Sequence, residues 1–334
     1  MSQNETLIKV KNLKKWFPVK QSFLHSLLSR EQNYVKAIDG VSFHIKRGEI
    51  FGLAGESGCG KTTTGKTLLR LVEPTEGEAY FGDQNIFNLN KRELKEFRRK
   101  AQIIYQDPYE SLDPRMTIYD FVAEPLQIHG IGEVKRRVTE ALEKAEITPP
   151  EEYFYRFPHE LSGGQRQRVA IARAMVLEPE FIMADEPVSM LDASIRSSIL
   201  ELMFKLRDEM GIAYLYVTHD LATARQVCDR LAIMYLGRIV EEAQIDDLLE
   251  TPRHPYTQAL IAAVPDPDPT AEKSKAVITG EVPNPSNIPT GCRFHPRCPY
   301  TMEICSVEDP EYVEVKEGHR VTCHLFDHLL DKKN

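Results

Sequence analysis

The sequence predicts an α/β protein with a parallel central sheet, followed by a small C-terminal domain rich in proline and cysteine. Up to about residue 250, short apolar runs bounded by glycine alternate with segments of helical periodicity, which is typical of parallel strands joined by helices. Beyond residue 252 proline becomes dense, and only residues 256–263 have helical spacing, so we expect the rest of this region to be rich in loops. We therefore predict two domains, residues 1–252 and residues 253–334.

Local periodicity predicts the elements of the first domain. Apolar runs of strand length, the last two forming a hairpin, lie at residues 7–13, 49–54, 103–105, 181–184, 212–217, 231–236 and 238–240. Helical spacing predicts a helix at residues 61–72. Residues 91–100 (KRELKEFRRK) interleave acidic with basic side chains, and we interpret them as the solvated face of a helix. We interpret residues 19–34 as an inserted amphipathic stretch.

Composition and charge exclude several functional classes. The formal net charge of the 334 residues is −8, so the basic footprint of a nucleic-acid-binding protein is missing. No apolar run approaches the roughly 20 residues that a membrane-spanning helix needs. The N-terminus lacks the charged-then-apolar layout of a signal peptide. We therefore expect the chain in the cytosol, where any membrane role works through partners.

Residues 55–62 (GESGCGKT) fit the phosphate-binding pattern G-x-x-x-x-G-K-[ST], between a predicted strand and a predicted helix. Glycines let backbone N–H groups curl around phosphate oxygens, and the helix N-terminus adds partial positive charge. Lys61 is expected to reach the β- and γ-phosphates, and the Thr62 hydroxyl to ligate Mg²⁺. A chance glycine-rich turn is the alternative. The predicted nucleotide contacts here are Gly55, Ser57, Gly58, Gly60, Lys61, Thr62 and Thr63.

Two carboxylates end the apolar strand at residues 181–186 (FIMADE). In a protein with a phosphate-binding loop, we expect Asp185 to hold Mg²⁺ and Glu186 to polarise the attacking water as general base. An ordinary acidic turn after a strand is the alternative.

Residues 161–165 (LSGGQ), followed by RQRVAIARAM, resemble the signature sequence of ABC ATPases. The resemblance implies a RecA-like core with an antiparallel β subdomain and a helical subdomain. It also implies a head-to-tail dimer, in which the signature of one subunit closes over the γ-phosphate bound to the other. The signature residues that would contact this nucleotide are Ser162, Gly163, Gly164 and Gln165.

The remaining marks of the same family are present in order along the chain, and together all the marks cover about residues 7–245. Gln106 (in IIYQDP) is similar to the glutamine that contacts Mg²⁺ and links the site to membrane subunits. Asp192 closes a segment (SMLD) that resembles the D-loop. His219 (in YVTHD) resembles the switch histidine that contacts the γ-phosphate. The family stacks an aromatic side chain on adenine, and Phe17 matches best, with the neighbouring Trp16 as the alternative.

Four of the six cysteines crowd into the C-terminal region at spacing C-x5-C-x6-C-x17-C, namely Cys292, Cys298, Cys305 and Cys323. Thiolates suit Zn²⁺ or an iron–sulfur cluster, and the close pairs of a zinc ribbon are missing. The flanking HPYTQAL and PTGCRFHPRCP resemble the C-terminal extension of oligopeptide and dipeptide transporter ATPases, some of which bind a 4Fe–4S cluster. We predict a 4Fe–4S cluster on these cysteines. Zn²⁺ and free structural thiols are the alternatives, and His295, His319 and His324 are possible replacement ligands.

The resemblance implies an ATP-hydrolysing subunit of a dipeptide or oligopeptide importer, on the cytoplasmic face of the cell membrane. Its partners would be a second ATPase subunit, related or identical, and two transmembrane permease subunits. Peptides would arrive from an extracytoplasmic binding protein that never touches this chain. The alternatives are an ATPase for another solute such as nickel, a soluble ABC ATPase acting on nucleic acid, and a redox sensor without catalysis. The single cassette without a basic patch argues against nucleic acid, and intact Lys61, Glu186 and His219 argue against a vestigial ATPase.

Overall fold

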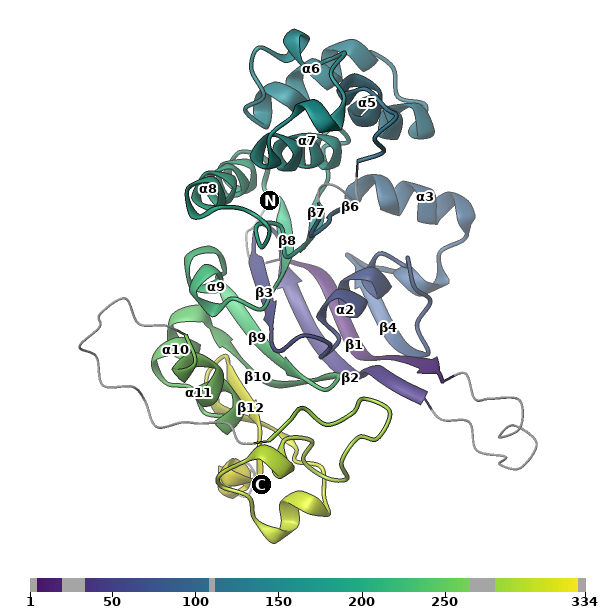
Figure 1. Cartoon of the computed structure of the whole chain (residues 1–334). Coiled ribbons are helices and arrows are strands. Elements are labelled where there is room, and N and C mark those ends of the chain that lie inside the picture. The colour runs from purple at the N-terminus through teal and green to yellow at the C-terminus, as the bar shows by residue number, and fades with distance from the viewer. Residues whose placement is uncertain (1–4, 20–33, 108–111, 265–279, 330–334) are drawn as a thin grey trace, which may run out of the picture. The chain divides into compact units, whose positions relative to one another are not determined.

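The computed structural model describes residues 5–19, 34–107, 112–264 and 280–329 (Figure 1). The chain divides into two compact units, each assembled from separate stretches of sequence. The first unit comprises Met1–Ile8, Ile45–Ile50 and Phe81–Val217. The second comprises Lys9–His44, Phe51–Tyr80 and Thr218–Asn334. Of the predicted amphipathic insertion, residues 20–33 lie outside the described residues.

The first unit contains three parallel strands in the order β8-β7-β6. Every residue of β7 is buried, as expected for a parallel strand covered on both faces. The three predicted strands are confirmed, with bounds at Ala101–Ile104 (β6), Phe181–Asp185 (β7) and Ala213–Thr218 (β8). The register pairs Asp185 with Val217 and Ala184 with Ile104, so β6 ends level with the acidic end of β7.

The first unit also contains the short β5 (Gln84–Asn85) and several α-helices. Their bounds are Lys91–Lys100 (α3), Ile118–His129 (α5), Val134–Lys144 (α6), Gly163–Met175 (α7) and Ala193–Met210 (α8). α5, α6 and α7 pack against one another through apolar faces that include Leu126, Val138 and Val169. Phe97 is the one buried residue of α3, which confirms the solvated charged face predicted for this helix.

The second unit holds five neighbouring strands in the order β11-β12-β10-β9-β3 (Figure 1). β3 runs parallel to β9, and the remaining pairs are antiparallel. The bounds are Ile50–Ala54 (β3), Arg230–Tyr235 (β9), Arg238–Gln244 (β10), Tyr312–Lys316 (β11) and His319–Thr322 (β12). The helix predicted at residues 256–263 is confirmed by α11 (Pro255–Ala262). The region predicted to be rich in loops also contains β11 and β12, which extend the sheet from the edge of β10.

A second sheet of this unit has the strand order β2-β1-β4. Its strands are Thr6–Pro18 (β1), Tyr34–Lys46 (β2) and Glu76–Phe81 (β4). The helices are Lys61–Leu68 (α2), Leu221–Val227 (α9), Ile245–Glu250 (α10) and Pro255–Ala262 (α11). α2 is shorter than predicted and ends just before Arg70, whose φ of 50° is incompatible with a continuing helix. Among the described helices, none combines the length and apolarity needed to cross a membrane.

Candidate nucleotide-binding site

The phosphate-binding loop joins β3 to α2. Gly55 and Gly60 have φ values of 150° and 110°, which side chains rarely adopt. A Cβ on Gly55 would lie 2.2 Å from the carbonyl oxygen of Met234, and a Cβ on Gly60 would lie 2.0 Å from that of Ala37. Glycine is therefore required at both positions, for conformation and for space.

The loop ends at an uncapped helix N-terminus that suits an anion. Gly60 is the N-cap of α2, and no side chain caps the helix. The first N–H groups of a helix lack partners within it and carry partial positive charge. Lys61 is 6% exposed, and its Nζ donates to the carbonyl oxygens of Gly55 and Glu56 at 2.7 and 3.0 Å. The ammonium group thus lies inside the loop, and Thr62 and Thr63 follow on the first turn of α2.

Two side chains from the C-terminal region contact this loop, and sequence reasoning missed both. The Tyr256 hydroxyl accepts a hydrogen bond from the Glu56 N–H at 2.9 Å. Both Nη atoms of Arg297 donate to the Glu56 carboxylate, at 2.9 and 3.1 Å. The partners lie 200 and 241 residues apart in the chain, so no local pattern signals these contacts.

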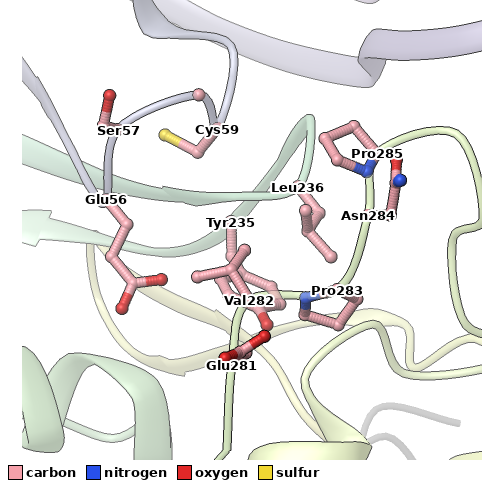
Figure 2. A pocket seen from close by; sticks show the side chains of 11 residues that line it. Glu56, Ser57, Cys59, Tyr235, Leu236, Glu281, Val282, Pro283, Asn284 and Pro285 are labelled. Atoms are coloured by element: carbon pink, nitrogen blue, oxygen red, sulfur yellow. The ribbon is translucent and has the colours of Figure 1, made fainter.

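A cavity of about 530 Å³ opens beside the phosphate loop. It is lined by residues 56–59 of the loop, by Tyr235 and Leu236 at the end of β9, and by residues 281–285 of the C-terminal region. Figure 2 shows Ser57 and Cys59 on one side of this space and Pro283 and Pro285 on the other. The predicted nucleotide contacts Ser57 and Gly58 therefore border an open volume.

The predicted catalytic residues of the first unit gather at the end of β7. Asp185 is 5% exposed, and the next residue, Glu186, has a φ of 46° and donates its N–H to the carbonyl oxygen of Val217 at 2.9 Å. A glutamate in the left-handed region is uncommon and is often found at functional positions. Gln106 Nε2 donates to Glu186 Oε2 at 2.9 Å and to Ser189 Oγ at 3.4 Å. Gln106, Glu186 and the first residue of the D-loop segment are thus in contact.

The signature segment forms the N-terminus of α7. Ser162 is its N-cap and makes a capping box with Gln165, in which each side chain binds the backbone N–H of the other residue, at 3.3 and 3.0 Å. A Cβ on Gly164 would lie 2.7 Å from Cγ2 of Ile195, so a glycine lets α7 approach α8 closely. The first-turn N–H groups of Gly163 and Gly164 are in the position from which helices bind phosphate.

Comparison with known proteins identifies the family. The family model for ABC transporters matches residues 38–189, and that for the oligopeptide/dipeptide transporter C-terminal region matches residues 240–305. The oligopeptide transport ATP-binding protein AppF of Bacillus subtilis is 43% identical over 97% of this chain and 99% of its own length. A putative peptide import ATP-binding protein of Brucella ovis is 47% identical over 86% of this chain and 92% of its own. The chain belongs to the ABC transporter ATP-binding proteins.

Solved structures support the same assignment. CbiO1 from Clostridium perfringens, part of the ABC transporter complex CbiONQ, matches with a TM-score of 0.63 and 26% identity, over 74% of this chain and 92% of its own. The ATP-binding cassette MJ0796, in a dimeric post-hydrolysis state with ADP and Pi, matches with a TM-score of 0.60 and 34% identity, over 71% of this chain and 98% of its own. This ABC ATPase therefore has the P-loop fold with a mixed sheet and helices that its sequence predicts.

Two adjacent aromatic residues of β1 are candidates for stacking on adenine. Phe17 is 38% exposed, with the ammonium group of Lys15 4.8 Å from its ring centroid. Trp16 is held more firmly, since its Nε1 donates to Asp39 Oδ1 at 3.0 Å. The charge of Lys36 lies 4.8 Å from the Trp16 ring. The exposed ring of Phe17 suits stacking on a ligand, and the hydrogen-bonded Trp16 suits a supporting role.

His219 and Asp192 each mark the start of a helix in this ABC ATPase. His219 is exposed directly after β8 and precedes Asp220, whose carboxylate caps α9 by accepting from the N–H groups of Ala222 and Thr223. Asp192 is the exposed N-cap of α8, and its side chain makes no cap hydrogen bond. The phosphate loop and His219 belong to the second unit, whereas Asp192, the two carboxylates at the end of β7 and the signature segment belong to the first.

The four C-terminal cysteines carry free thiols. Cys305 and Cys323 are buried, and the Cys292 N–H donates to the carbonyl oxygen of Cys305 at 2.8 Å. Burial raises the pKa of Cys323 to about 12, and the charges of the other three cysteines add to the increase. In the part of the chain that the structure describes, however, no group of three or more His, Cys, Asp or Glu side chains is arranged to hold a metal ion.

The three histidines of this region have other partners. His319 Nε2 lies 2.7 Å from Glu241 Oε1, and both side chains are buried. His324 Nδ1 lies 2.7 Å from Asp327 Oδ2, and His295 Nδ1 lies 2.9 Å from the carbonyl oxygen of Cys292. Each imidazole therefore contributes to the local fold.

Proposed function

We propose that this ABC ATPase powers the uptake of dipeptides or oligopeptides. The observation that carries the proposal is the match of residues 240–305 to the oligopeptide/dipeptide transporter C-terminal region, in a chain similar over 97% of its length to an oligopeptide transport protein. ATP binding closes a dimer of nucleotide-binding domains, and hydrolysis reopens it. These movements switch two transmembrane permease subunits between inward- and outward-facing states.

The partners and the location of the chain are parts of the same proposal. The second ATPase subunit is a related chain or a second copy, which is supported by the dimeric structure of MJ0796. The chain works at the cytoplasmic face of the cell membrane, and the peptide-binding protein acts from the other side without touching it. Residues 1–252 provide the nucleotide-binding domain and residues 253–334 the transporter extension.

The chemistry proposed for this chain is hydrolysis of ATP by an activated water. Lys61 and the N–H groups of the loop hold the phosphates, and Phe17 stacks on the base. Glu186 accepts the proton of the attacking water, positioned by its hydrogen bond from Gln106. Mg²⁺ neutralises phosphate charge in such reactions, and its proposed ligands are Thr62, Gln106 and Asp185. The nucleotide bound to the opposite subunit is contacted by the signature and D-loop residues Ser162, Gly163, Gly164, Gln165 and Asp192. The γ-phosphate of the nucleotide bound to the same subunit is contacted by His219.

The substitution Glu186→Gln tests the catalytic part. The amide keeps the shape of the side chain but cannot accept a proton, so we expect turnover to fall about 10²- to 10⁴-fold. ATP-bound dimers should accumulate, measured by size-exclusion chromatography with radiolabelled ATP. The matched control is Glu201→Gln on the exposed face of α8, which should hydrolyse ATP at the wild-type rate. Unchanged hydrolysis by Glu186→Gln would remove this residue from the mechanism.

The peptide cargo needs a test of its own. In a bacterial strain whose peptide importer lacks this subunit, the wild-type chain should restore uptake of a radiolabelled dipeptide or tripeptide, and Glu186→Gln should not. Restored nickel uptake without peptide uptake would refute the peptide assignment and leave the ATPase assignment in place.

We propose that Cys292, Cys298, Cys305 and Cys323 bind a 4Fe–4S cluster. The support is the sequence of the extension and the backbone hydrogen bond between Cys292 and Cys305. The described side chains do not form a ligand set as they stand. Anaerobically purified protein should absorb broadly in the visible range and contain about four irons and four sulfides per chain. One zinc per chain in a colourless sample would establish Zn²⁺ instead, and neither metal would establish free thiols.

A further inference from the structure

A short segment of the C-terminal region brings two buried arginines to the nucleotide-binding unit. Arg293 and Arg297 lie between Cys292 and Cys298, and each is 7% exposed. A buried guanidinium needs a partner for its charge, because leaving it unpaired costs several kcal/mol. The partners of both arginines lie in the core of the second unit, on or beside the phosphate loop.

Arg297 holds the first half of the loop. It forms the two-pronged pair with the Glu56 carboxylate described above, and its Nη1 also donates to the Tyr235 hydroxyl at 3.3 Å. Arg297 donates both of these hydrogen bonds to Glu56, and a guanidinium group is always positively charged in proteins. Tyr256 binds the N–H of Glu56, and Lys61 binds its carbonyl oxygen. Both the backbone and the side chain of Glu56 are therefore fixed.

The charge of Glu56 gives this pairing a function. A carboxylate in a loop that binds phosphates repels them, and the repulsion is strong wherever water is excluded. Arg297 neutralises the carboxylate with a fork-to-fork geometry that a lysine cannot reproduce. Without Arg297, Glu56 would present an unpaired negative charge beside the phosphate site.

Arg293 holds the second half of the loop through the turn between β9 and β10. Its Nη1 donates to the carbonyl oxygen of Leu236, and its Nη2 pairs with Asp39. Gly237, which follows Leu236 in this turn, donates its N–H to the carbonyl oxygen of Cys59 at 2.8 Å. The carbonyl oxygen of Gly237 accepts a hydrogen bond from the Asp39 N–H at 2.8 Å. Arg293 therefore holds the β9–β10 turn, which is hydrogen-bonded to Cys59 near the end of the loop. Arg297 holds Glu56 near the beginning of the loop.

We infer that Arg293 and Arg297 are positioning residues of the phosphate loop, through which the C-terminal extension supports ATP binding. The inference rests on the proposed nucleotide site and extends it by giving part of the extension a role in the ATPase itself. Neither arginine touches the nucleotide in this proposal. They act by holding Glu56 and the β9–β10 turn.

The decisive experiment is a double-mutant cycle on the full-length chain. Arg297→Met removes the charge and keeps an unbranched side chain, and Glu56→Gln removes the carboxylate that Arg297 neutralises. Affinity is measured by titration with a fluorescent ATP analogue, kcat and KM by steady-state hydrolysis, and folding by thermal denaturation of the same samples. Because small misplacements of a binding group cost up to about 10²-fold, we expect Arg297→Met to raise the Kd and KM for ATP about 10- to 100-fold, with a smaller effect on kcat.

The same substitution should matter much less when Glu56→Gln is already present, since no unpaired carboxylate remains. If Arg297→Met does not fold, Arg297→Lys keeps the charge without the fork and should give a smaller rise in Kd. The matched control is Lys316→Met, which breaks an exposed ion pair with Asp247 (2.8 Å) in the same unit and should leave ATP affinity unchanged.

Two results would overturn the inference. One is wild-type ATP affinity in a folded Arg297 variant, and the other is an equal loss of affinity with and without Glu56→Gln. Lys61→Ala separates this failure from failure of the nucleotide site. If Lys61→Ala abolishes ATP binding while Arg297→Met does not change it, the site stands and only the positioning role is refuted.

Discussion

Phe294→Ala should be one of the most destabilising single substitutions in the C-terminal region. The Phe294 side chain is 1% exposed, and its ring centroid lies 5.4 Å from the rings of both Tyr235 and Tyr256 and 5.6 Å from that of His254. Replacing a buried phenylalanine with alanine costs about 3–5 kcal/mol. Each aromatic pair contributes roughly 0.5–1.5 kcal/mol beyond area burial. We therefore expect a loss of about 4–5 kcal/mol, a large share of the 5–15 kcal/mol typical of a folded domain.

The measurement is urea unfolding followed by tryptophan fluorescence. The chain has a single tryptophan, Trp16, which lies on β1 of the same unit and reports its unfolding. Phe294→Leu is the control, because it keeps most of the apolar volume and loses only the aromatic pairs, so it should cost less than Phe294→Ala. A Phe294→Ala protein within about 1 kcal/mol of wild type would refute the view that this cluster joins the extension to β9.

Two further perturbations follow from the same unit. Gly60→Ala places a methyl group 2.0 Å from the carbonyl oxygen of Ala37, whereas the methyl group of Gly58→Ala meets nothing within 4 Å. Titration with ATP should therefore show no binding for Gly60→Ala. Binding by Gly58→Ala should be weakened only by backbone strain, about 1–2 kcal/mol. Equal losses would contradict the steric argument. Burial lowers the pKa of His254 to about 4, against the opposing charge of Glu241, so the stability this neutral imidazole contributes is complete above about pH 6.5 and is lost as pH falls toward 4. His254→Asn keeps an N-cap side chain for α11. Between pH 7 and 5 its free energy of unfolding in urea should fall less than that of wild type, by up to about 1.4 kcal/mol per pH unit. Parallel declines of the two proteins would show that His254 does not titrate in this way.

The elements that carry the nucleotide motifs could be predicted because their signals are local. β3 and β7 are both apolar runs. The glycine-rich phosphate loop directly follows β3, and the two predicted catalytic carboxylates stand at the end of β7. Buried parallel strands need apolar residues at every position, so their short runs stand out from the surrounding sequence. The N-cap of α7 was predictable for the same reason, since Ser162 and Gln165 lie three residues apart.

The C-terminal strands could not be predicted, because what makes them strands lies elsewhere in the chain. In β11 and β12 the residues that point into the core are few, chiefly Val313 and Val321. β12 pairs with Glu241 and Glu242 on β10, about eighty residues earlier, and β11 pairs in turn with β12. Residues 312–322 (YVEVKEGHRVT) contain three valines and no proline, but strands of five and four residues are too short for an unambiguous period. Pairing of β12 with the edge of β10 fixes the conformation of this segment.

The same reasoning explains why the supports of the phosphate loop escaped detection. The loop itself is a dense local motif, but a motif describes what contacts the ligand and leaves out what holds the loop in place. Arg297 follows a proline and precedes a cysteine, and in sequence it is indistinguishable from a solvated arginine. Only the fold shows that it is buried and faces Glu56, at 2.9 and 3.1 Å. The extension, which sequence alone separates from the ATPase at residue 252, is thus in its contacts part of the structure that shapes the ATP site. A chain ending at residue 252 would lose Phe294 and the two partners of Glu56 that lie in the extension, Tyr256 and Arg297.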